Sequence, residues 1–252
     1  MTKTVFITGA TSGFGEACAH RFAADGWNLI LTGRRRDRLA ALNEELASKT
    51  EVLTLAVDVR DRDEMTRAID HLPEKFARLT GLINNAGLAL GIDPAQKCSL
   101  DDWETMVDTN IKGLMFTTRL LLPRLIAEGR GASIVNIGSV AGSWPYPGGN
   151  VYGGTKAFVR QFSLGLRCDL AGTGVRVTDL EPGLCESEFT LVRFGGDKAR
   201  YDATYAGANP VQPKDIAETC FWLMNQPAHL NINALEIMPV SQTWAGFAIH
   251  RE

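Results

Sequence analysis

The chain has 252 residues, of which 45% are hydrophobic and 22% charged, and its formal net charge is −3. This composition is typical of a globular protein with an ample core, and the small negative charge argues against nucleic-acid binding. The sequence shows no signal-peptide pattern and no stretch approaching the ~20 apolar residues of a membrane span, so we expect neither secretion nor membrane insertion.

The cysteines and histidines show no pattern of a disulfide framework or a metal site. The five cysteines are scattered and include no C-x-x-C pair, and the four histidines lack the spacing of metal ligands. We therefore expect reduced thiols, no bound metal and a cytoplasmic location.

Residues 4–8 form a short apolar run that predicts a buried parallel strand, and a helical pattern occupies residues 16–24. Between them lies a turn with glycines in G-x-x-x-G-x-G spacing. Glycines let the backbone approach a pyrophosphate, and the next helix offers free N–H groups and the positive end of its dipole. The pattern favours a dinucleotide site over a plain strand–helix turn, with these contacts: Gly9, Thr11, Ser12, Gly13, Phe14 and Gly15.

The second predicted strand, residues 27–32, is not followed by the acid that binds the ribose 2′-hydroxyl of NAD in Rossmann units. Three arginines follow Gly33 instead. Guanidinium groups are planar, permanently charged and bidentate, which suits a 2′-phosphate. We therefore predict NADP as the cofactor, with Arg34 and Arg35 as phosphate ligands. The alternative is a solvated basic start to the next helix, and Arg36 fits that interpretation.

A helical pattern at residues 38–47 and a third strand at 52–57 lead to Asp58 and Val59, which we assign to the cofactor site. Asp58 either receives the adenine amino group or caps the helix that begins near Asp61. A fourth strand ends in two amides, a small residue and a glycine. This run suits a backbone that lies against a ligand while the asparagines pin neighbouring strands: Asn84, Asn85, Ala86 and Gly87, the last three assigned to the cofactor site.

A long helical region is predicted at residues 100–126, where apolar residues recur at three- and four-residue steps. Asn110 lies within this stripe, and a polar amide there needs partners. It either bends the helix by bonding the backbone or holds a water. The stripe is broad, so part of it packs in the core or faces another subunit.

Residues 132–138 form the next predicted strand, which delivers Ser139 at its carboxyl end, where ligands bind in open α/β sheets. Tyr152 and Lys156 follow on a predicted helix at 151–170 and share a face because they are four residues apart. A free tyrosine has a pKa of about 10, and a neighbouring ammonium lowers it. Tyr152 then serves as acid/base for carbonyl–alcohol interconversion, with Ser139 holding the substrate oxygen. Taken alone, Tyr-x-x-x-Lys also fits a helix with a half-buried tyrosine and a surface lysine.

The remaining chain supplies further elements of the same kind. Residues 184–209 have weak periodicity and several glycines, and we interpret them as a substrate lid. No repeat or linker interrupts the sequence, so residues 1–252 are expected to be one domain. The alternation predicts an α/β Rossmann-type doubly wound parallel sheet flanked by helices, completed by elements at 175–180, 213–225 and 233–237.

Over nearly its whole length, this series of motifs resembles the short-chain dehydrogenase/reductase family. The resemblance is carried by the glycine turn, the Asn-Asn-Ala-Gly run, and Asn110, Ser139, Tyr152, Lys156, Pro182 and Gly183. It implies that Tyr152 is the acid/base, that Lys156 lowers its pKa and binds the nicotinamide ribose, and that Ser139 orients the substrate. It also implies that Asn110 holds a water in a proton relay.

The same resemblance extends to the residues around the nicotinamide. It implies that Pro182 and Gly183 flank that ring. Family members often carry a cofactor-contacting threonine four or five residues after this glycine, and Ser187 stands in that region here.

Later segments are similar to the NADP-dependent 3-hydroxy acid dehydrogenases, also called allo-threonine or serine dehydrogenases. These segments are residues 142–146, 188–194 and 227–233. The similarity implies interconversion of the β-hydroxyl of serine-like amino acids and 3-hydroxy acids with the 3-oxo acid or semialdehyde. It also implies a homotetramer built partly from the helices that carry Asn110 and Tyr152.

A carboxylate substrate needs a cation or N–H donors in its pocket. Our candidate is Arg193 on the lid, unless it forms a surface salt bridge. Trp144 and Tyr146 either wall the pocket or pack within their loop. Two other functions are a reductase of bulkier ketones or 3-oxoacyl groups and a non-catalytic dinucleotide sensor, although the Ser/Tyr/Lys set is complete. Preferred substrate, stereochemistry and direction are not fixed by such motifs.

Overall fold

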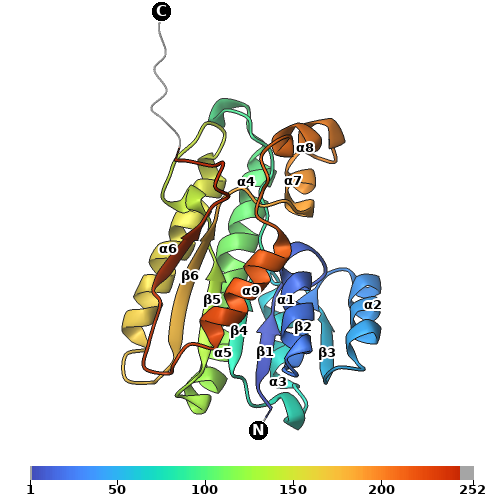
Figure 1. The fold of residues 1–252 in the computed structure, drawn as a ribbon, viewed down its shortest axis with the longest axis vertical. Helices are drawn as coiled ribbons and strands as arrows, with labels where there is room; N and C mark the ends of the chain where they lie inside the picture. The colour runs from blue at the N-terminus through green and yellow to red at the C-terminus, as the bar shows by residue number, and fades with distance from the viewer. Residues whose placement is uncertain (1, 245–252) are drawn as a thin grey trace, which may run out of the picture.

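A computed structural model describes residues 2–244 and contains a seven-stranded parallel sheet in the order β3-β2-β1-β4-β5-β6-β7 (Figure 1). The chain runs outward from β1 to β3, then returns to place β4 on the other side of β1. This confirms the predicted doubly wound topology, in which a ligand crevice opens where the strand order reverses. The strands are Thr4–Ile7, Asn28–Gly33, Val52–Ala56, Gly81–Asn84, Ser133–Ile137, Arg176–Pro182 and Ala234–Ile237.

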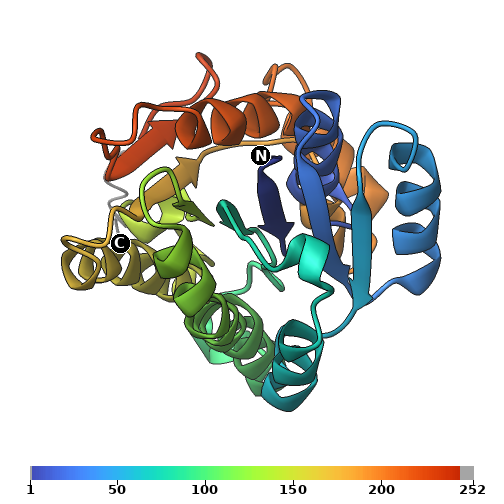
Figure 2. The same ribbon diagram turned by 90° about the horizontal axis from the view of Figure 1, so that it is seen from below.

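Helices cover both faces of the sheet, as Figure 2 shows end-on. One face carries α1 (Gly13–Ala24), α2 (Arg36–Leu46) and α9 (Pro213–Met224). The opposite face carries α3 (Arg62–Asp70), α5 (Leu114–Glu128) and α6 (Asn150–Asp169), with α4 (Leu100–Val107) packed beside α6. The central strands are apolar and buried because both of their faces are covered.

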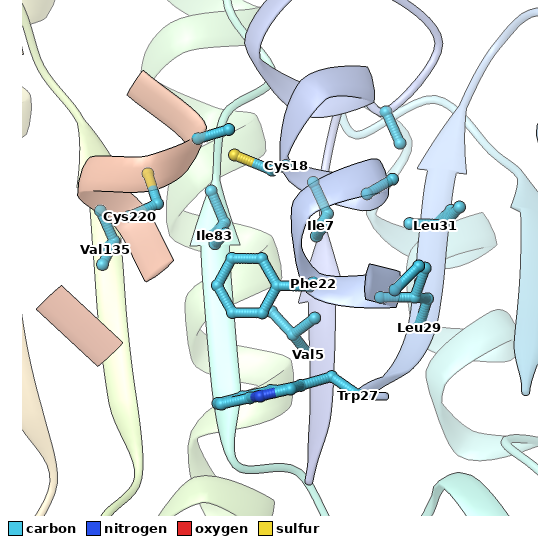
Figure 3. Packing of buried hydrophobic residues seen from close by; sticks show 14 of the residues in the cluster. Val5, Ile7, Cys18, Phe22, Trp27, Leu29, Leu31, Ile83, Val135 and Cys220 are labelled. Atoms are coloured by element: carbon cyan, nitrogen blue, oxygen red, sulfur yellow. The ribbon is translucent and has the colours of Figure 1, made fainter. Parts of the chain in front are cut away.

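Apolar side chains fill the layer between α1, α9 and the sheet, and Phe22 and Trp27 are among them (Figure 3). The Phe22 ring meets the Trp27 ring edge-on with centroids 5.0 Å apart, and Phe221 of α9 packs on Phe22 at 5.3 Å. Full burial of a Phe side chain stabilises the fold by roughly 1.5–3 kcal/mol. This layer fixes α1, and therefore the glycine turn before it, against the sheet.

The helical region predicted at 100–126 is interrupted. Between α4 and α5, residues Asp108–Gly113 form a π-helical segment, here η3. Such wide turns occur mostly as single insertions inside α-helices and often at functional sites. The periodicity prediction missed the break because apolar residues continue at helical spacing on both sides of it.

Two other segments differ from the sequence-based boundaries. Strand β6 was predicted to end at residue 180 but continues through Glu181 and Pro182, which pair with Glu236 and Ile237 of β7. The lid contains two short helices, α7 (Glu188–Arg193) and α8 (Lys198–Tyr205). Their N-caps are Ser187 and Asp197, whose side chains each accept a backbone N–H of the first helical turn. The weak apolar periodicity of this segment did not indicate the two helices.

The lid lies beyond the carboxyl ends of the strands, above α1 and α9 in Figure 1. Besides η3, three short 3-10 segments connect the main elements: Glu74–Phe76, Ala95–Lys97 and Val140–Gly142. In the described part of the chain, no helix is both long and apolar enough to cross a membrane. The outer limits of the domain predicted at 1–252 lie outside the described residues.

Candidate active site

A cavity of about 340 Å³ lies at the carboxyl ends of the strands. Its walls come from segments that are distant in the sequence but adjacent at this edge of the sheet. Six consecutive strand ends contribute to it, namely those of β1 to β6: residues 9–14, 33–35, 57–59, 85–88, 137–139 and 182–183. α6, η3 and the lid close the remaining sides.

The glycine turn does not accommodate side chains at Gly9 and Gly15. Gly9 has a φ of 66°, in the left-handed region that favours glycine. A Cβ on Gly15 would lie 2.3 Å from the Gly9 carbonyl oxygen. Ser12 is the N-cap of α1, yet its side chain makes no capping hydrogen bond. The first N–H groups of α1 therefore remain available to an anion, which fits a pyrophosphate.

Arg35 does not project freely into the cavity. Its guanidinium donates to Thr11 Oγ1 at 3.1 Å, to Ser12 Oγ at 2.7 Å and to Glu188 of the lid at 3.0 Å. Arg38 donates to the same Glu188 carboxylate at 2.8 Å. The two arginines hold the pKa of Glu188 below its usual value. Arg35 thus joins the glycine turn to the lid, which the local arginine run did not predict.

Arg34 lines the cavity and is solvent-exposed, whereas Arg36 begins α2 and faces away from the cavity lining. Asp58 and Val59 line the cavity as expected. The alternative role of Asp58 as a helix cap is wrong, because Asp61 Oδ1 accepts the Glu64 N–H at 2.8 Å and caps α3. Asp58 instead accepts from Arg60 at 2.7 Å.

The asparagine run after β4 connects strands, as the sequence predicted. Asn84 Nδ2 donates to Asn136 Oδ1 of β5 at 2.8 Å. Asn85 Nδ2 donates to the Thr8 and Gly9 carbonyls at 2.9 and 3.1 Å. Asn85, Ala86 and Gly87 line the cavity. The amides therefore fix the relative positions of β4, β5 and the glycine turn.

Asn110 is buried in η3 and bonds another backbone segment. Its Oδ1 accepts the Leu88 N–H at 2.9 Å, and its Nδ2 donates to the Leu88 carbonyl at 2.8 Å and to Thr155 Oγ1 at 3.0 Å. A Cβ on Gly87 would lie 3.3 Å from Asn110 Oδ1 and 3.7 Å from Lys156 Nζ. Asn110 and Lys156 therefore approach the same glycine, although Asn110 is not part of the cavity lining.

Ser139, Tyr152 and Lys156 meet at one side of the cavity. Ser139 follows β5, and its hydroxyl donates to the Pro182 carbonyl at 3.4 Å and acts to lower the pKa of Tyr152. Lys156 lies one helical turn after Tyr152 on α6, with Nζ 5.8 Å from the tyrosine ring centroid. Lys156 Nζ donates to the Ile137 carbonyl at 2.7 Å. A phenol, a hydroxyl and an ammonium thus face one point, as carbonyl–alcohol interconversion requires.

Burial dominates the electrostatics of the tyrosine and the lysine. Burial raises the pKa of Tyr152, while the Ser139 hydroxyl and the Arg193 guanidinium act to lower it. Burial also lowers the pKa of Lys156 to about 8, against the opposing influence of Asp179. Removing either group from water disfavours its charged form, and burial is the largest cause of both shifts.

Arg193 lies at the end of α7 on the side of the cavity that holds Tyr152. Its Nη2 donates to the Tyr146 hydroxyl at 2.8 Å and its Nε to the Gly91 carbonyl at 3.2 Å. Its guanidinium lies 5.6 Å from the Tyr152 ring centroid and 5.4 Å from that of Tyr146. Among the described residues no Asp or Glu pairs with Arg193, so the surface salt bridge that we considered is absent from this part of the chain.

Trp144 is placed away from this pocket. Its indole N–H donates to Glu236 at 3.0 Å, its ring packs on Trp244 at 5.6 Å, and 44% of it is exposed. Trp144 therefore packs at the surface and does not wall the pocket. Tyr146, by contrast, is partly buried against the cluster that contains Tyr152, and its hydroxyl accepts from Arg193.

Pro182, Gly183 and Ser187 line the cavity, and the Ser187 hydroxyl accepts the Phe189 N–H at 3.3 Å. Ten lining residues were not among the predicted site residues. Three of them lie in the family-like segment 188–194, and the others had no motif to mark them. The ten are Gly33, Val57, Leu88, Thr109, Ile137, Gly138, Cys185, Glu188, Phe189 and Val192.

Comparisons with known proteins agree with this geometry. The sequence profile of the family described as short chain dehydrogenase matches residues 3–194. Sulfoacetaldehyde reductase 2 of Chromohalobacter salexigens is 58% identical over 252 residues, covering 100% of both chains. Serine 3-dehydrogenase of Agrobacterium fabrum is 56% identical, also over 100% of both chains.

A third relative and a solved structure extend the likeness to the cofactor. The NADP-dependent 3-hydroxy acid dehydrogenase of Salmonella typhi is 54% identical over 98% of this chain and 99% of its own. The closed form of a serine dehydrogenase complexed with NADP+ superimposes with a TM-score of 0.94 at 51% identity, covering 99% of this chain and 100% of that one.

Proposed function

This chain belongs to the short-chain dehydrogenase/reductase family, and we propose that it is an NADP-dependent dehydrogenase of small anionic hydroxy compounds. Its main substrates are 3-hydroxy acids and serine-like amino acids, whose β-hydroxyl it interconverts with a 3-oxo acid or semialdehyde. The observation that carries this proposal is the Arg193 guanidinium, bonded to Tyr146 and 5.6 Å from the Tyr152 ring.

Bound NADP supplies or accepts the hydride. The glycine turn and the free N-terminus of α1 hold its pyrophosphate, and Arg34 binds the 2′-phosphate at the cavity rim, supported by Arg35. Asp58 and Val59 line the adenine end, while Pro182 and Gly183 line the nicotinamide end. Lys156 holds the nicotinamide ribose.

Tyr152 moves the substrate proton. Its hydroxyl donates to the carbonyl oxygen during reduction and accepts the alcohol proton during oxidation. Ser139 orients the same oxygen, and its hydroxyl favours the phenolate by acting to lower the pKa of Tyr152. Positive charge from Lys156 and Arg193 lies within reach of the tyrosine ring. Asn110, fixed by Leu88, holds a water that passes protons from Lys156 outward.

The anionic end of the substrate is recognised by Arg193. Its Nε and Nη2 donate to the Gly91 carbonyl and the Tyr146 hydroxyl, and these bonds hold the guanidinium in place. Its remaining N–H groups bind the substrate anion. Because no acid among the described residues neutralises it, its charge is available to a carboxylate near Tyr152. A tyrosine hydroxyl beside it offers a further polar contact.

A second candidate substrate is an aldehyde carrying a sulfonate. Two sulfoacetaldehyde reductases of Chromohalobacter salexigens are 58% and 59% identical to this chain. A sulfonate presents the same negative charge to Arg193 at a similar distance from the reacting carbon. Whether carboxylate or sulfonate is preferred depends on lid residues, so the two are compared directly in the experiment below.

We further propose a homotetramer that uses the helices carrying Asn110 and Tyr152, and a cytoplasmic location. Relatives that match the entire chain are themselves dehydrogenases or reductases of small molecules by name. Large apolar side chains on α4 and α5, which flank the segment that carries Asn110, are exposed in the single chain: Leu100, Met115 and Ile126. They are the surface that such an assembly would cover.

The test measures NADP-dependent turnover of serine, 3-hydroxypropionate, a 2-hydroxyethyl sulfonate and a neutral primary alcohol of similar length. Replacing Arg193 by Met should lower kcat/KM for the anions by about 30- to 1,000-fold, as expected when one partner of a buried charge pair is removed. The neutral alcohol should change several-fold at most.

The matched control is Arg200→Met, on the exposed surface of α8 in the same lid. Equal losses on charged and neutral substrates in the Arg193 variant would contradict the anion site. Turnover of the neutral alcohol alone would leave the proton chemistry in place and favour the reductase of bulkier ketones. NADP binding without any turnover would favour the dinucleotide sensor.

A further inference from the structure

Two acidic side chains lie behind the active site, on a strand where every residue is buried. Asp179 and Glu181 occupy alternate positions of β6, so both point to the same face of the sheet. Asp179 is 0% exposed and Glu181 4%. Acidic residues are almost never this buried unless they are paired.

The surroundings of Asp179 provide no ordinary donor. No N–H or O–H among the described residues donates to either of its carboxyl oxygens, and Glu181 Oε1 is likewise without a hydrogen-bond donor. Glu181 stands two residues further along the same face of the strand and acts to raise the pKa of Asp179. A hydrogen bond between two carboxyl groups requires a proton on one of them, and carboxylates this close do not both ionise readily.

The Asp179 carboxyl also lies against the segment that joins it to the catalytic residues. A Cβ on Gly138 would be 2.3 Å from Asp179 Oδ1. Gly138 stands between Ile137, whose carbonyl accepts the Lys156 ammonium, and Ser139. Asp179 and Lys156 therefore flank one short piece of backbone.

The charged groups that face this pair come from three elements. On β7, Glu236 pairs with Glu181 in register and so stands on the same face, where its carboxylate accepts the indole N–H groups of Trp144 and Trp244. On α6, Lys156 and Arg160 are one turn apart and both face β6, and Arg160 Nε lies 3.5 Å from Glu181 Oε1. Arg160 also bonds Ser143 and is partly exposed. On β6 the only other charge at this face is the partner carboxyl itself, within the described residues.

We propose that Asp179 and Glu181 form a carboxyl pair that shares one proton at neutral pH and sets the charge state of Lys156. With its proton the pair carries a single negative charge, held by Glu181 against Arg160. When the proton leaves to solvent, the second negative charge appears beside Lys156 and keeps the ammonium charged. Asp179 is thus a positioning residue that acts through Lys156.

The titration directions agree with this arrangement. Burial and Glu181 raise the pKa of Asp179 to about 8, while Lys156 and Arg160 oppose the rise. Burial lowers the pKa of Lys156 to about 8, and Asp179 opposes the fall. The two groups therefore change charge over the same pH range, and each alters the other there.

The first test is infrared spectroscopy of the full protein. The wild type should show the C=O stretching band of a protonated carboxylic acid at neutral pH, shifted in D₂O and lost as the pH rises through about 8. Asp179→Asn should abolish the band, whereas Asp169→Asn, an exposed position at the end of α6, should keep it. Absence of the band in the wild type, or its persistence in Asp179→Asn, would overturn the proposal.

The second test follows kcat for alcohol oxidation against pH and rests on the proposed function. Asparagine cannot ionise, so Lys156 in Asp179→Asn should lose its charge at lower pH. The phenolate of Tyr152 would then be less stabilised, and the acid limb of the profile should move to higher pH by about half a unit or more. A uniform fall in kcat without this displacement would indicate a structural role and refute the proposal. The infrared result does not need turnover, so it distinguishes failure of the pair from failure of the proposed substrate.

Discussion

The glycine turn and the lid both border the cavity, but they are built in opposite ways. The turn is held by backbone contacts, such as the Asn85 amide on the Thr8 and Gly9 carbonyls. The lid is held by polar side chains that reach across the cavity, such as Glu188 to Arg35 and Arg38. The backbone contacts of the turn fix the part of the site that binds the cofactor. The side-chain contacts of the lid leave the part that binds the substrate adjustable.

This difference predicts which substitutions should impair every reaction of the protein and which should impair the binding of one ligand. A substitution in the turn disturbs backbone that every reaction uses. A substitution in the lid alters one contact and one ligand group. The next three predictions test that distinction, beginning with the largest effect.

Gly15→Ala should be damaging on the turn side. The new Cβ would lie 2.3 Å from the Gly9 carbonyl oxygen and 2.6 Å from Asn85 Nδ2, so α1 or the turn must shift. Overpacking of this kind costs about 1–3 kcal/mol of stability. A shift near 1 Å should weaken NADP binding by about 100-fold. Urea unfolding and NADPH fluorescence titration measure the two effects.

Gly165→Ala is the control, because nothing lies within 4 Å of an added Cβ there. This helical substitution on α6 should stabilise the protein by about 0.5–1 kcal/mol without altering NADP binding. Wild-type affinity in Gly15→Ala would show that the turn tolerates movement, and the contrast between turn and lid would then fail.

The sequence predicted the turn side well because its signals are local. Apolar runs marked the strands, and glycine spacing marked the phosphate turn within a few residues. The fold, the family and the use of NADP were confirmed on that basis. The π-helical break at 108–113 escaped prediction because the apolar pattern runs through it.

Features that depend on long-range contacts could not be predicted. Arg35 meets Glu188 across 153 residues of sequence, so no local pattern distinguishes it from Arg34. Asp179 and Glu181 looked like ordinary members of a strand and its following turn. Their burial is visible only once β6 is placed between β5 and β7 with helices over both faces of the sheet.

Arg34 and Arg35 give the second prediction. Arg34 has no side-chain hydrogen bond among those found in residues 2–244 and faces the cavity, whereas Arg35 is engaged with the turn and the lid. Arg34→Ser should raise the KM for NADP by about 10- to 100-fold, the loss expected for a charged hydrogen bond. The KM for NAD should stay nearly constant, because NAD lacks the 2′-phosphate.

Arg36→Ser serves as the matched control, since that exposed side chain begins α2 outside the cavity lining. Steady-state kinetics with both cofactors measure the ratio. Equal changes with NADP and NAD would mean that Arg34 acts on the shape of the site rather than on the phosphate.

Ser187 gives the smallest effect and tests how the lid begins. Its hydroxyl accepts the Phe189 N–H and caps α7. Its Cβ is 3.5 Å from the position that a Cβ on Gly13 would occupy, so Ser187 lies against the glycine turn. Ser187→Ala removes a cap worth about 1 kcal/mol, so we expect a two- to five-fold rise in the KM for NADP and for the anionic substrate. Hydrogen exchange of the α7 amides in the free protein should quicken by a similar factor.

Asp197→Ala removes the equivalent cap of α8, away from the cavity lining, and should quicken exchange only in α8. A raised KM with unchanged α7 exchange would show that the Ser187 hydroxyl serves the cofactor directly, and the lid would then share the turn's role rather than contrast with it.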